Sequence, residues 1–435
     1  MRQEQFRSKG VESSYAWLRL MVSLALMTIG GVGMYGSAVV LPAMQADFAV
    51  PRADASLPYT VTLIGFGIGG IVMGRLADRY GVMVVALIGA LGLGVGFAAA
   101  GSASSLWQFS LAHGLLIGLL GTSATFAPLV ADTSQWFDRR RGIALAICMS
   151  GNYLAGAVWP PIMQHFIDSV GWRTTYVGLG VVCFVTMVPL ALLLRDRPPV
   201  APVVPVAGAG ARAPAPLRSA RFVGRSDPAR PLGLHPAMLQ FLLCVAGVAC
   251  CVAMAMPQVH IVAYCTDLGF GAARGAEMLS LMMAAGIVSR LASGWISDHI
   301  GGLHTLLLGS VLQGVALLMF LPSSGLVPLF VVSGMFGLFQ GGIVPSYALV
   351  VREYFTPMQA GARVGTVLMA TLLGMALGGW MSGAIFDWTG SYRAAFVNGI
   401  AWNALNLAIV GFLIYRARTG HPPARPTPPV GALPI

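Results

Sequence analysis

Charged residues are scarce in this sequence. They make up only 9% of the 435 residues, whereas 57% are hydrophobic and the mean hydropathy is +0.78. Soluble domains carry about 25% charged residues, so this composition excludes an ordinary soluble globular protein. Lysine is almost missing: of the 26 basic residues, Lys9 alone is a lysine. Mechanisms that use a lysine inside a membrane are therefore excluded.

Several functional motifs are missing as well. No Gly-x-x-x-x-Gly-Lys-[Ser/Thr] loop is present, which excludes a nucleotide as the energy source. None of the six cysteines forms a Cys-x-x-Cys pair, so neither a disulfide framework nor a metal site is expected. The net charge of +11 lies in loops between apolar runs, which argues against nucleic-acid binding. No nucleophile triad stands out, and we expect a protein that is not an enzyme and has no cofactor.

Long apolar runs are what the sequence does have. A helix needs about 20 mostly apolar residues to cross a bilayer, and twelve runs qualify. They begin near Leu20, Leu57, Val82, Leu106, Ile143, Thr175, Met238, Met278, Thr305, Leu326, Val364 and Ala394. The polar N-terminus is too long for a signal peptide, so we expect an uncleaved first span. Glycines at helical spacing, such as Gly374 and Gly378, predict close helix packing.

The distribution of basic residues predicts the orientation. With the N-terminus in the cytoplasm, 21 basic residues lie inside, four lie outside and Arg290 lies in the membrane. This bias favours both chain ends inside, and we expect a multi-pass protein of a bacterial-type inner membrane. The predicted segments are an N-terminal cytoplasmic segment (1–19), a six-helix bundle (20–194), a proline-rich disordered linker (195–236), a second six-helix bundle (237–416) and a disordered tail (417–435).

The two halves repeat each other. Gly74-Arg-Leu-Ala-Asp78-Arg79-Tyr-Gly81 and Gly294-Trp-Ile-Ser-Asp298-His-Ile-Gly301 both fit Gly-x-x-x-Asp-x-x-Gly, 220 residues apart. Ile167-Asp168-Ser-Val-Gly171 and Phe386-Asp387-Trp-Thr-Gly390 match at an offset of 219. Two matched pairs at nearly one offset indicate an internal duplication. In transporters, such repeats surround a binding site near the membrane midplane.

Arg290 is a fixed charge inside an apolar run. It lies in the middle of Met278–Ile296, about 12 Å from Asp298 at 1.5 Å per residue. An arginine at a helix centre costs roughly 2.5–3.5 kcal/mol, so it must face a partner or a water-filled cavity. Because we find no acid elsewhere in the spans, and a guanidinium is a natural fork for a carboxylate, we expect Arg290 to bind a small organic anion. The alternative is a structural arginine bonded to backbone carbonyls or to a neutral side chain.

Other polar residues in the spans are weaker candidates. Each could orient a substrate or merely join helices: Tyr35, Tyr347, Asn152, Gln340 and Asn403. Two histidines could carry a proton because their reference pKa is near 6.5; His260 and His113 could equally be packed groups. Otherwise the anion itself takes the proton, or the protein is a uniporter or exchanger. Trp159-Pro160-Pro161 predicts a break in span five.

Together these residues resemble the major facilitator superfamily. The loop Gly74–Gly81 looks like that superfamily's signature between spans two and three. The resemblance implies an all-α membrane protein of twelve transmembrane helices in two pseudo-symmetric six-helix bundles, N-in and C-in. It also implies that Asp78 caps a helix end and pairs with arginines across the halves. Arg139, Arg140 and Arg141 are then either a conformational latch or a solvated, lipid-facing anchor.

A narrower resemblance is to the monocarboxylate transporters and the oxalate:formate antiporters. It is carried by Trp136-Phe-Asp-Arg-Arg-Arg-Gly-Ile-Ala144, by Ser150-Gly151 and by Gly171-Trp172-Arg173. Both groups have a span-eight arginine that binds the substrate carboxylate, where this sequence has Arg290. The aspartate that animal monocarboxylate transporters have four residues earlier is Gly286 here, and the lysines of both groups are missing. A single fixed cation implies a substrate with one carboxylate and disfavours oxalate. Because the aspartate is missing, no arginine–aspartate pair is available to couple a proton.

We therefore expect a secondary active or facilitative carrier of small organic anions, monocarboxylates in the first place, in a lipid bilayer, with proton coupling left open. A drug exporter of the same superfamily is the main alternative. Such exporters usually have Gly-x-x-x-Gly-Pro in span five, which is incomplete here at Gly151–Ala157, and they commonly carry acids in the membrane. A membrane sensor or scaffold is a third hypothesis, but it would need a soluble domain.

Overall fold

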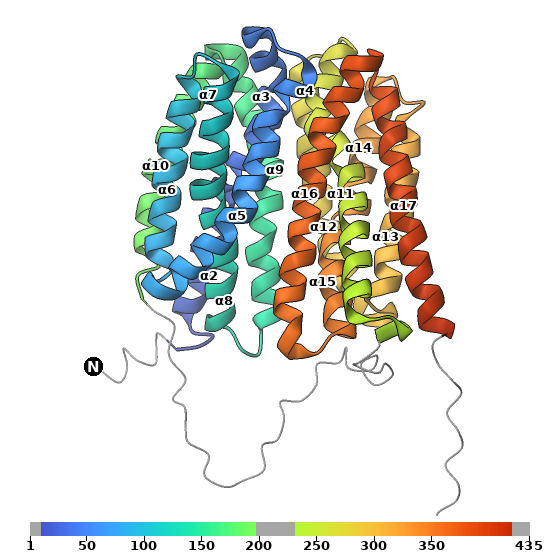
Figure 1. The fold of residues 1–435 in the computed structure, drawn as a ribbon. Helices are drawn as coiled ribbons and strands as arrows, with labels where there is room; N and C mark the ends of the chain where they lie inside the picture. The colour runs from blue at the N-terminus through green and yellow to red at the C-terminus, as the bar shows by residue number, and fades with distance from the viewer. Residues whose placement is uncertain (1–9, 197–230, 420–435) are drawn as a thin grey trace, which may run out of the picture.

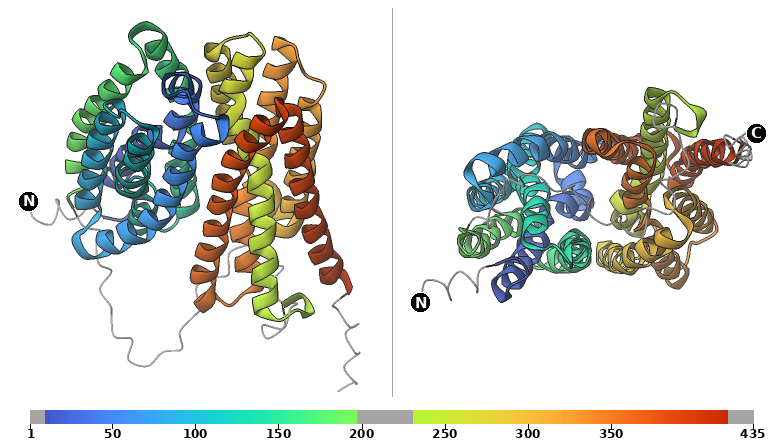
Figure 2. Two further views of the ribbon diagram at one scale, coloured as in Figure 1. Left: turned by 45° about the horizontal axis from the view of Figure 1, so that its top comes forward. Right: turned by 90° about the horizontal axis from the view of Figure 1, so that it is seen from below.

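The apolar runs form membrane-length helical segments. The computed structural model describes residues 10–196 and 231–419, and these contain helices and no strand. Twelve segments are long and apolar enough to cross a membrane. They form two bundles that stand side by side (Figure 1), and a view from below shows them as separate rings of helices (Figure 2). The expected all-α fold of two six-helix bundles is confirmed, while its orientation in the membrane stays a prediction.

The N-terminal bundle contains six spans, several of them built from more than one helix. They are α2 (Ser14–Gly30) with α3 (Val32–Phe48), α4 (Arg52–Ala55) with α5 (Leu57–Tyr80), α6 (Val82–Gly101), α7 (Leu106–Leu111) with the π-helix η1 (Ala112–Thr122) and α8 (Ala127–Trp136), α9 (Arg141–Val170), and α10 (Trp172–Leu192).

The C-terminal bundle repeats this order. Its helices are α11 (Pro236–Asp267), α12 (Ala272–Ile300), α13 (Gly302–Phe320), α14 (Leu326–Gln340) with α15 (Ile343–Tyr354), α16 (Pro357–Thr389) and α17 (Tyr392–Thr419). A 3-10 turn, η3 (Pro231–Gly233), precedes α11. Most of the expected linker, residues 197–230, and most of the expected tail, 420–435, lie outside the described residues, as do residues 1–9.

The repeated motifs end matched helices in the two bundles. Gly81 (φ 92°) ends α5 and Gly301 (φ 81°) ends α12. Gly171 (φ 82°) follows α9 and Gly390 (φ 65°) follows α16. Glycine adopts positive φ without the steric cost of a Cβ, so the same residue stops the helix at the same place in each half.

The expected break in span five is wrong. Helix α9 runs without interruption through Pro160 and Pro161. Proline 161 has no N–H to donate to the carbonyl of Ala157, one turn earlier. The hydroxyl of Ser280 in α12 donates to that carbonyl instead. A partner from the other half thus satisfies the freed carbonyl, as backbone groups in a membrane require.

The two bundles meet along two helix pairs. Helix α9 packs against α12, and α5 packs against α16, with α3 and α11 also in contact. We call the end at which α2 begins and α17 ends the lower end, and the end that holds α4 the upper end, as drawn in Figure 1. These contacts bring spans one, two, five, seven, eight and eleven to a common central interface.

Close glycine contacts hold neighbouring spans together inside each half. In the C-terminal bundle, a Cβ at Gly374 of α16 would lie 2.6 Å from the carbonyl oxygen of Val248 in α11, and one at Gly378 would lie 2.6 Å from that of Val252. The predicted close packing at these two glycines is therefore confirmed. Gly365, on the same helix, has nothing within 4 Å of the corresponding position.

We predict that Gly374→Ala destabilises the protein because the added methyl forces α11 and α16 apart. Overpacking of this kind costs about 1–3 kcal/mol. Thermal unfolding of the purified protein in detergent should show a lower melting temperature for Gly374→Ala than for the matched control Gly365→Ala. Equal melting temperatures for the two variants would contradict the packing described here.

Candidate functional site

Arg290 lies inside α12, ten residues or about 15 Å from the helix end at Ile300. Its side chain is half-buried. The Nε and Nη1 atoms are buried and have no hydrogen-bond partner within residues 10–196 and 231–419. The ion pairs found in these residues do not include Arg290 either. The guanidinium therefore keeps donors free for an anion, as the carboxylate-fork hypothesis requires.

An aromatic ring lies against this guanidinium. The Cζ atom of Arg290 is 4.6 Å from the centroid of the Tyr153 ring, which comes from α9 in the other half. This ring also covers Gly286, since a Cβ added there would overlap Tyr153 Cε1. The contact is a cation–π interaction across the interface between the bundles.

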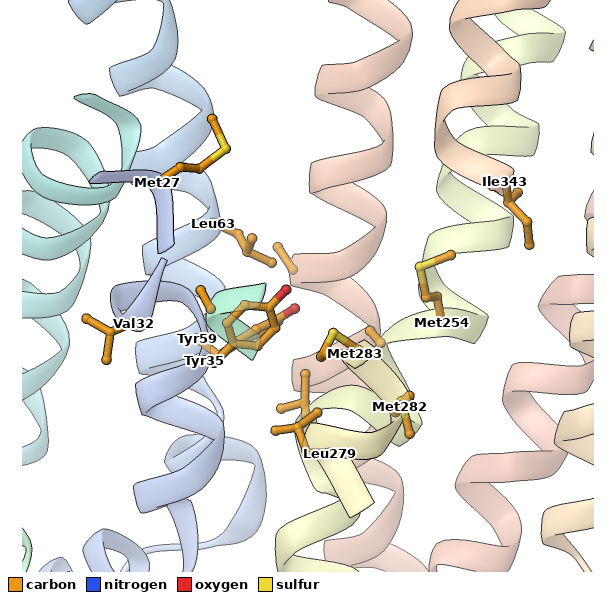
Figure 3. Close-up of a cluster of buried hydrophobic side chains, with 14 of the residues drawn as sticks. Met27, Val32, Tyr35, Tyr59, Leu63, Met254, Leu279, Met282, Met283 and Ile343 are labelled. Carbon is orange, nitrogen blue, oxygen red and sulfur yellow. The ribbon is translucent and has the colours of Figure 1, made fainter. Parts of the chain in front are cut away.

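Tyr35 extends the site toward spans one and two. Its ring packs on Gly156 of α9, where an added Cβ would lie 2.8 Å from Tyr35 Cζ and 2.5 Å from Met283 Cγ. Figure 3 shows Tyr35 beside Tyr59 of α5, with both hydroxyls pointing toward the C-terminal half. The structure thus brings Tyr35, a residue predicted from the sequence, to Arg290.

Tyr347 and Asn403 lie instead in a buried polar network within the C-terminal half. Tyr347 Oη donates to Asn406 Oδ1 (2.9 Å), and Asn406 Nδ2 donates to Ser310 Oγ (2.8 Å). Asn403 Nδ2 donates to the Ser310 carbonyl (3.0 Å). These bonds join α13, α15 and α17. In this conformation, the two residues connect helices, which is the alternative that the sequence left open.

Gln340 and Asn152 lie next to the Arg290 site. Gln340 accepts a hydrogen bond from Gln258 Nε2 (2.7 Å), and its own buried Nε2 has no partner among the described residues. The next residue, Gly341, packs on the backbone of Gly286, one turn from Arg290. Asn152 precedes Tyr153, and its Oδ1 lies 3.5 Å from the position of a Cβ at Gly31. Both residues therefore neighbour the site without contacting Arg290.

Both candidate histidines are fully buried and packed by local partners. His260 Nε2 donates to the Gly379 carbonyl (2.8 Å), and Nδ1 lies 3.0 Å from the Tyr392 hydroxyl. Because a carbonyl only accepts, Nε2 carries the proton and the neutral ring suits both bonds. His113 lies in the N-terminal half: its Nδ1 is 3.2 Å from Thr62 Oγ1, its ring is tilted against Phe109, and its buried Nε2 has no partner among the described residues.

The spans also hold acids, one buried and one half-buried, which corrects the expectation that they hold none. Asp132 in α8 is buried and pairs with Arg19 of α2 at 2.8 Å. Glu353 in α15 accepts from the backbone N–H of Gly302 (2.8 Å). The helices continue past the apolar runs, so these acids fall inside the spans near the lower end. Neither residue neutralises Arg290.

Arg52 closes the upper end of the interface. From the N-terminal half, its guanidinium makes two bonds to the Asp267 carboxylate (3.1 and 3.2 Å) and donates to Tyr392 Oη (2.7 Å). The carboxylate of Asp387 accepts from the backbone N–H groups of Arg52 and Ala53 (2.9 and 2.8 Å). We call Arg52, Asp267, Asp387 and Tyr392 the upper latch. A cavity of about 330 Å³ lies beside it, lined by Gln45, Arg52 and Asp267 among others.

Polar contacts between the halves are confined to the upper part of the molecule. Besides the upper latch, Thr60 Oγ1 donates to the Ala376 carbonyl (3.0 Å), and Ser280 donates to Ala157. Within the described residues, no hydrogen bond or ion pair joins the two halves in the lower halves of their helices. Polar bonds therefore join the two halves above the level of Arg290, and none in the described residues joins them below it.

The motif residues at the lower end are solvent-exposed in this conformation. Asp78, Arg79 and Asp298 are exposed, as are Arg139, Arg140 and Arg141. Asp78 makes no ion pair in the described part of the chain, so the pairing that the resemblance implied is not formed here. Glu12 accepts from the backbone N–H of Arg140 (2.7 Å), and this bond holds the pKa of Glu12 below its ordinary value.

Similarity to known proteins identifies the family. The sequence matches the Major Facilitator Superfamily over residues 21–336 and 278–434. The chain belongs to the Major Facilitator Superfamily. Among curated relatives, monocarboxylate transporter 13 of Bos taurus is 25% identical over 431 residues, covering 96% of this chain and 94% of that protein. Monocarboxylate transporter 11 of Mus musculus is 25% identical over 404 residues, covering 89% and 84%.

A solved structure supports the same fold. The bacterial homolog to the human lysosomal transporter Spinster, in an inward-facing and occupied conformation, superposes with a TM-score of 0.70. The match covers 94% of this chain and 98% of that chain at 14% identity. At this identity the likeness shows the fold of the superfamily and no more. Within the superfamily, the expected resemblance to the monocarboxylate transporter group is confirmed by the curated relatives.

Sequence reasoning missed Tyr153 and the upper latch of this superfamily member. Tyr153 follows Asn152 in an ordinary apolar run, and no motif places it opposite span eight. Gly286 was the one available signal for such a contact. Because no acid lies one turn before Arg290, another group must stabilise the guanidinium. Arg52 was counted only as an outside loop charge, and its partners come from three distant segments.

We predict that Arg52→Gln loosens the upper end because the bidentate pair with Asp267 and the bond to Tyr392 are lost. Cys265, buried near the upper end of α11, should then react faster with a thiol reagent, as measured by peptide-level mass spectrometry. Arg274→Gln is the matched control, since Arg274 is exposed and pairs with Glu277 on its own helix. Equal labelling of Cys265 in both variants would show that the cluster does not keep the upper end closed.

Proposed function

We propose that this protein is a secondary carrier of small monocarboxylates, in which Arg290 binds the carboxylate. The observation that carries the proposal is that Nε and Nη1 of the half-buried Arg290 are buried at the central interface and have no hydrogen-bond partner among residues 10–196 and 231–419. A guanidinium offers paired N–H donors that match the two oxygens of a carboxylate. The monocarboxylate transporter names of the curated relatives support the same substrate class.

The proposed transport cycle is alternating access around Arg290. In the present state, the upper latch joins the halves above the arginine, and the lower ends are not joined by polar bonds. With the orientation that the arginine bias predicts, in a bacterial-type inner membrane, this state admits an anion from the cytoplasm. Rocking of the halves would break the upper latch and bring the lower-end motif residues together, as in carriers built from repeats.

The proposed site suits an anion with one carboxylate and an apolar body. Arg290 supplies one positive charge, while Tyr35, Tyr153 and Met283 supply aromatic and thioether surface around it. A second carboxylate would enter this surface without a cation to pair with, and burying an unpaired charge is costly. A coupled proton would travel on the anion, since both ring nitrogens of His260 are engaged with Gly379 and Tyr392 and His113 is fully buried beside Thr62 within the N-terminal half.

We predict that Arg290→Ala lowers carboxylate uptake by about 30-fold or more, because removing one member of a buried charge pair costs roughly 2–5 kcal/mol. The measurement is uptake of radiolabelled acetate, lactate, pyruvate and benzoate into proteoliposomes. Arg274→Ala, which removes an exposed arginine, should behave as wild type. Unchanged uptake by correctly inserted Arg290→Ala would refute the proposed role.

We also predict that succinate and oxalate compete poorly with these monocarboxylates. Each leaves a carboxylate unpaired at a site with one arginine. Competition is measured by adding each dicarboxylate to the wild-type uptake assay, with the matching unlabelled monocarboxylate as control. Strong competition by succinate would require a second cation that the site described here does not contain. A protein that takes up none of the four acids but responds in a thermal-shift assay to tetraphenylphosphonium would favour the exporter alternative.

A further inference from the structure

The contact between Arg290 and Tyr153 depends on the residue at position 286. Gly286 lies one turn before Arg290 on α12, and side chains four residues apart meet on one face of a helix. The Tyr153 ring occupies the space where a side chain at 286 would begin, because a Cβ there would overlap Tyr153 Cε1. Only glycine at this position lets the ring reach the guanidinium.

The ring stabilises the arginine without neutralising it. An aromatic face attracts a cation through its quadrupole, so it offsets part of the desolvation cost of Arg290. A carboxylate at position 286 would instead pair with the guanidinium and neutralise its charge. With the ring against the guanidinium, Nε and Nη1 have no hydrogen-bond partner in the described residues.

We propose that Tyr153 is a positioning residue for anion binding: its ring holds Arg290 in place of an acidic partner and leaves the guanidinium N–H groups to the substrate, an arrangement that Gly286 makes possible. This inference rests on the proposed function of Arg290. It adds a residue from span five to the site. It also explains how Arg290 is stabilised although no acid lies one turn before it. Tyr153 acts through Arg290, and its hydroxyl has no part in the argument.

The first test is the kinetics of uptake by Tyr153→Leu and Tyr153→Phe in proteoliposomes. The probes are the radiolabelled acetate, lactate, pyruvate and benzoate used for Arg290. Leucine removes the aromatic face, so KM should rise by about 2- to 30-fold while kcat changes much less. Phenylalanine keeps the face and should restore the wild-type KM. A wild-type KM for Tyr153→Leu, or failure of phenylalanine to restore it, would overturn the proposal.

A double-mutant cycle tests whether Gly286 acts through the ring. Gly286→Ala should raise KM because its methyl displaces Tyr153, but in the Tyr153→Leu background it should have little further effect. Gly411→Ala in α17 is the matched control outside the site and the repeated motifs, since nothing lies within 4 Å of its Cβ position. Additive effects of Gly286→Ala and Tyr153→Leu would contradict the proposal.

A measurement without substrate separates this inference from the proposed function. Phenylglyoxal modifies arginine, and removal of the ring from one face of the guanidinium should speed modification of Arg290 in Tyr153→Leu, followed by peptide mass spectrometry. An unchanged rate would overturn the role of the ring even if Arg290→Ala abolishes uptake. Conversely, a faster rate together with uptake that does not depend on Arg290 would refute the proposed function and leave the ring contact standing.

Discussion

The site depends on one positive charge that has no acidic partner inside the membrane. An arginine at this depth costs roughly 2.5–3.5 kcal/mol, and a cation–π contact to a half-buried guanidinium such as this one returns about 0.5–2 kcal/mol. The contact with Tyr153 therefore stabilises Arg290 only in part. An incoming carboxylate would offset the remaining desolvation cost. The ring contact thus lets the folded protein hold Arg290 in the membrane, while the guanidinium still gains free energy from binding an anion.

The rest of the central interface is arranged around this charge. Tyr35 packs on Gly156 beside Met283, Tyr59 packs on Gly379, and the Gly379 carbonyl accepts from His260, which contacts Tyr392 of the upper latch. Packed and bonded residues thus connect the level of Arg290 with the upper end. At the lower end, Asp78, Arg79 and Asp298 are exposed and make no ion pair within the described residues. This asymmetry is what a carrier with one closed side requires.

Much of the fold could be predicted from the sequence, because each span must satisfy its backbone within one long apolar helix. The repeated glycine motifs located matched helix ends, and Arg290 was recognisable as a charge in an apolar run. The continuity of α9 was not predictable, since the partner of the Ala157 carbonyl is Ser280 in the other half. The Tyr153 contact and the upper latch were missed for the same reason: each joins distant segments whose relative placement no local pattern encodes.

Anomalous diffraction from crystals grown with 4-bromobenzoate tests the central claim most directly. The bromine signal locates the anion and gives its orientation relative to Arg290. Our account predicts the carboxylate within hydrogen-bonding distance of the Arg290 guanidinium, with the Tyr153 ring still against it. An anion found only in the cavity beside Arg52, with Arg290 unliganded, would contradict it.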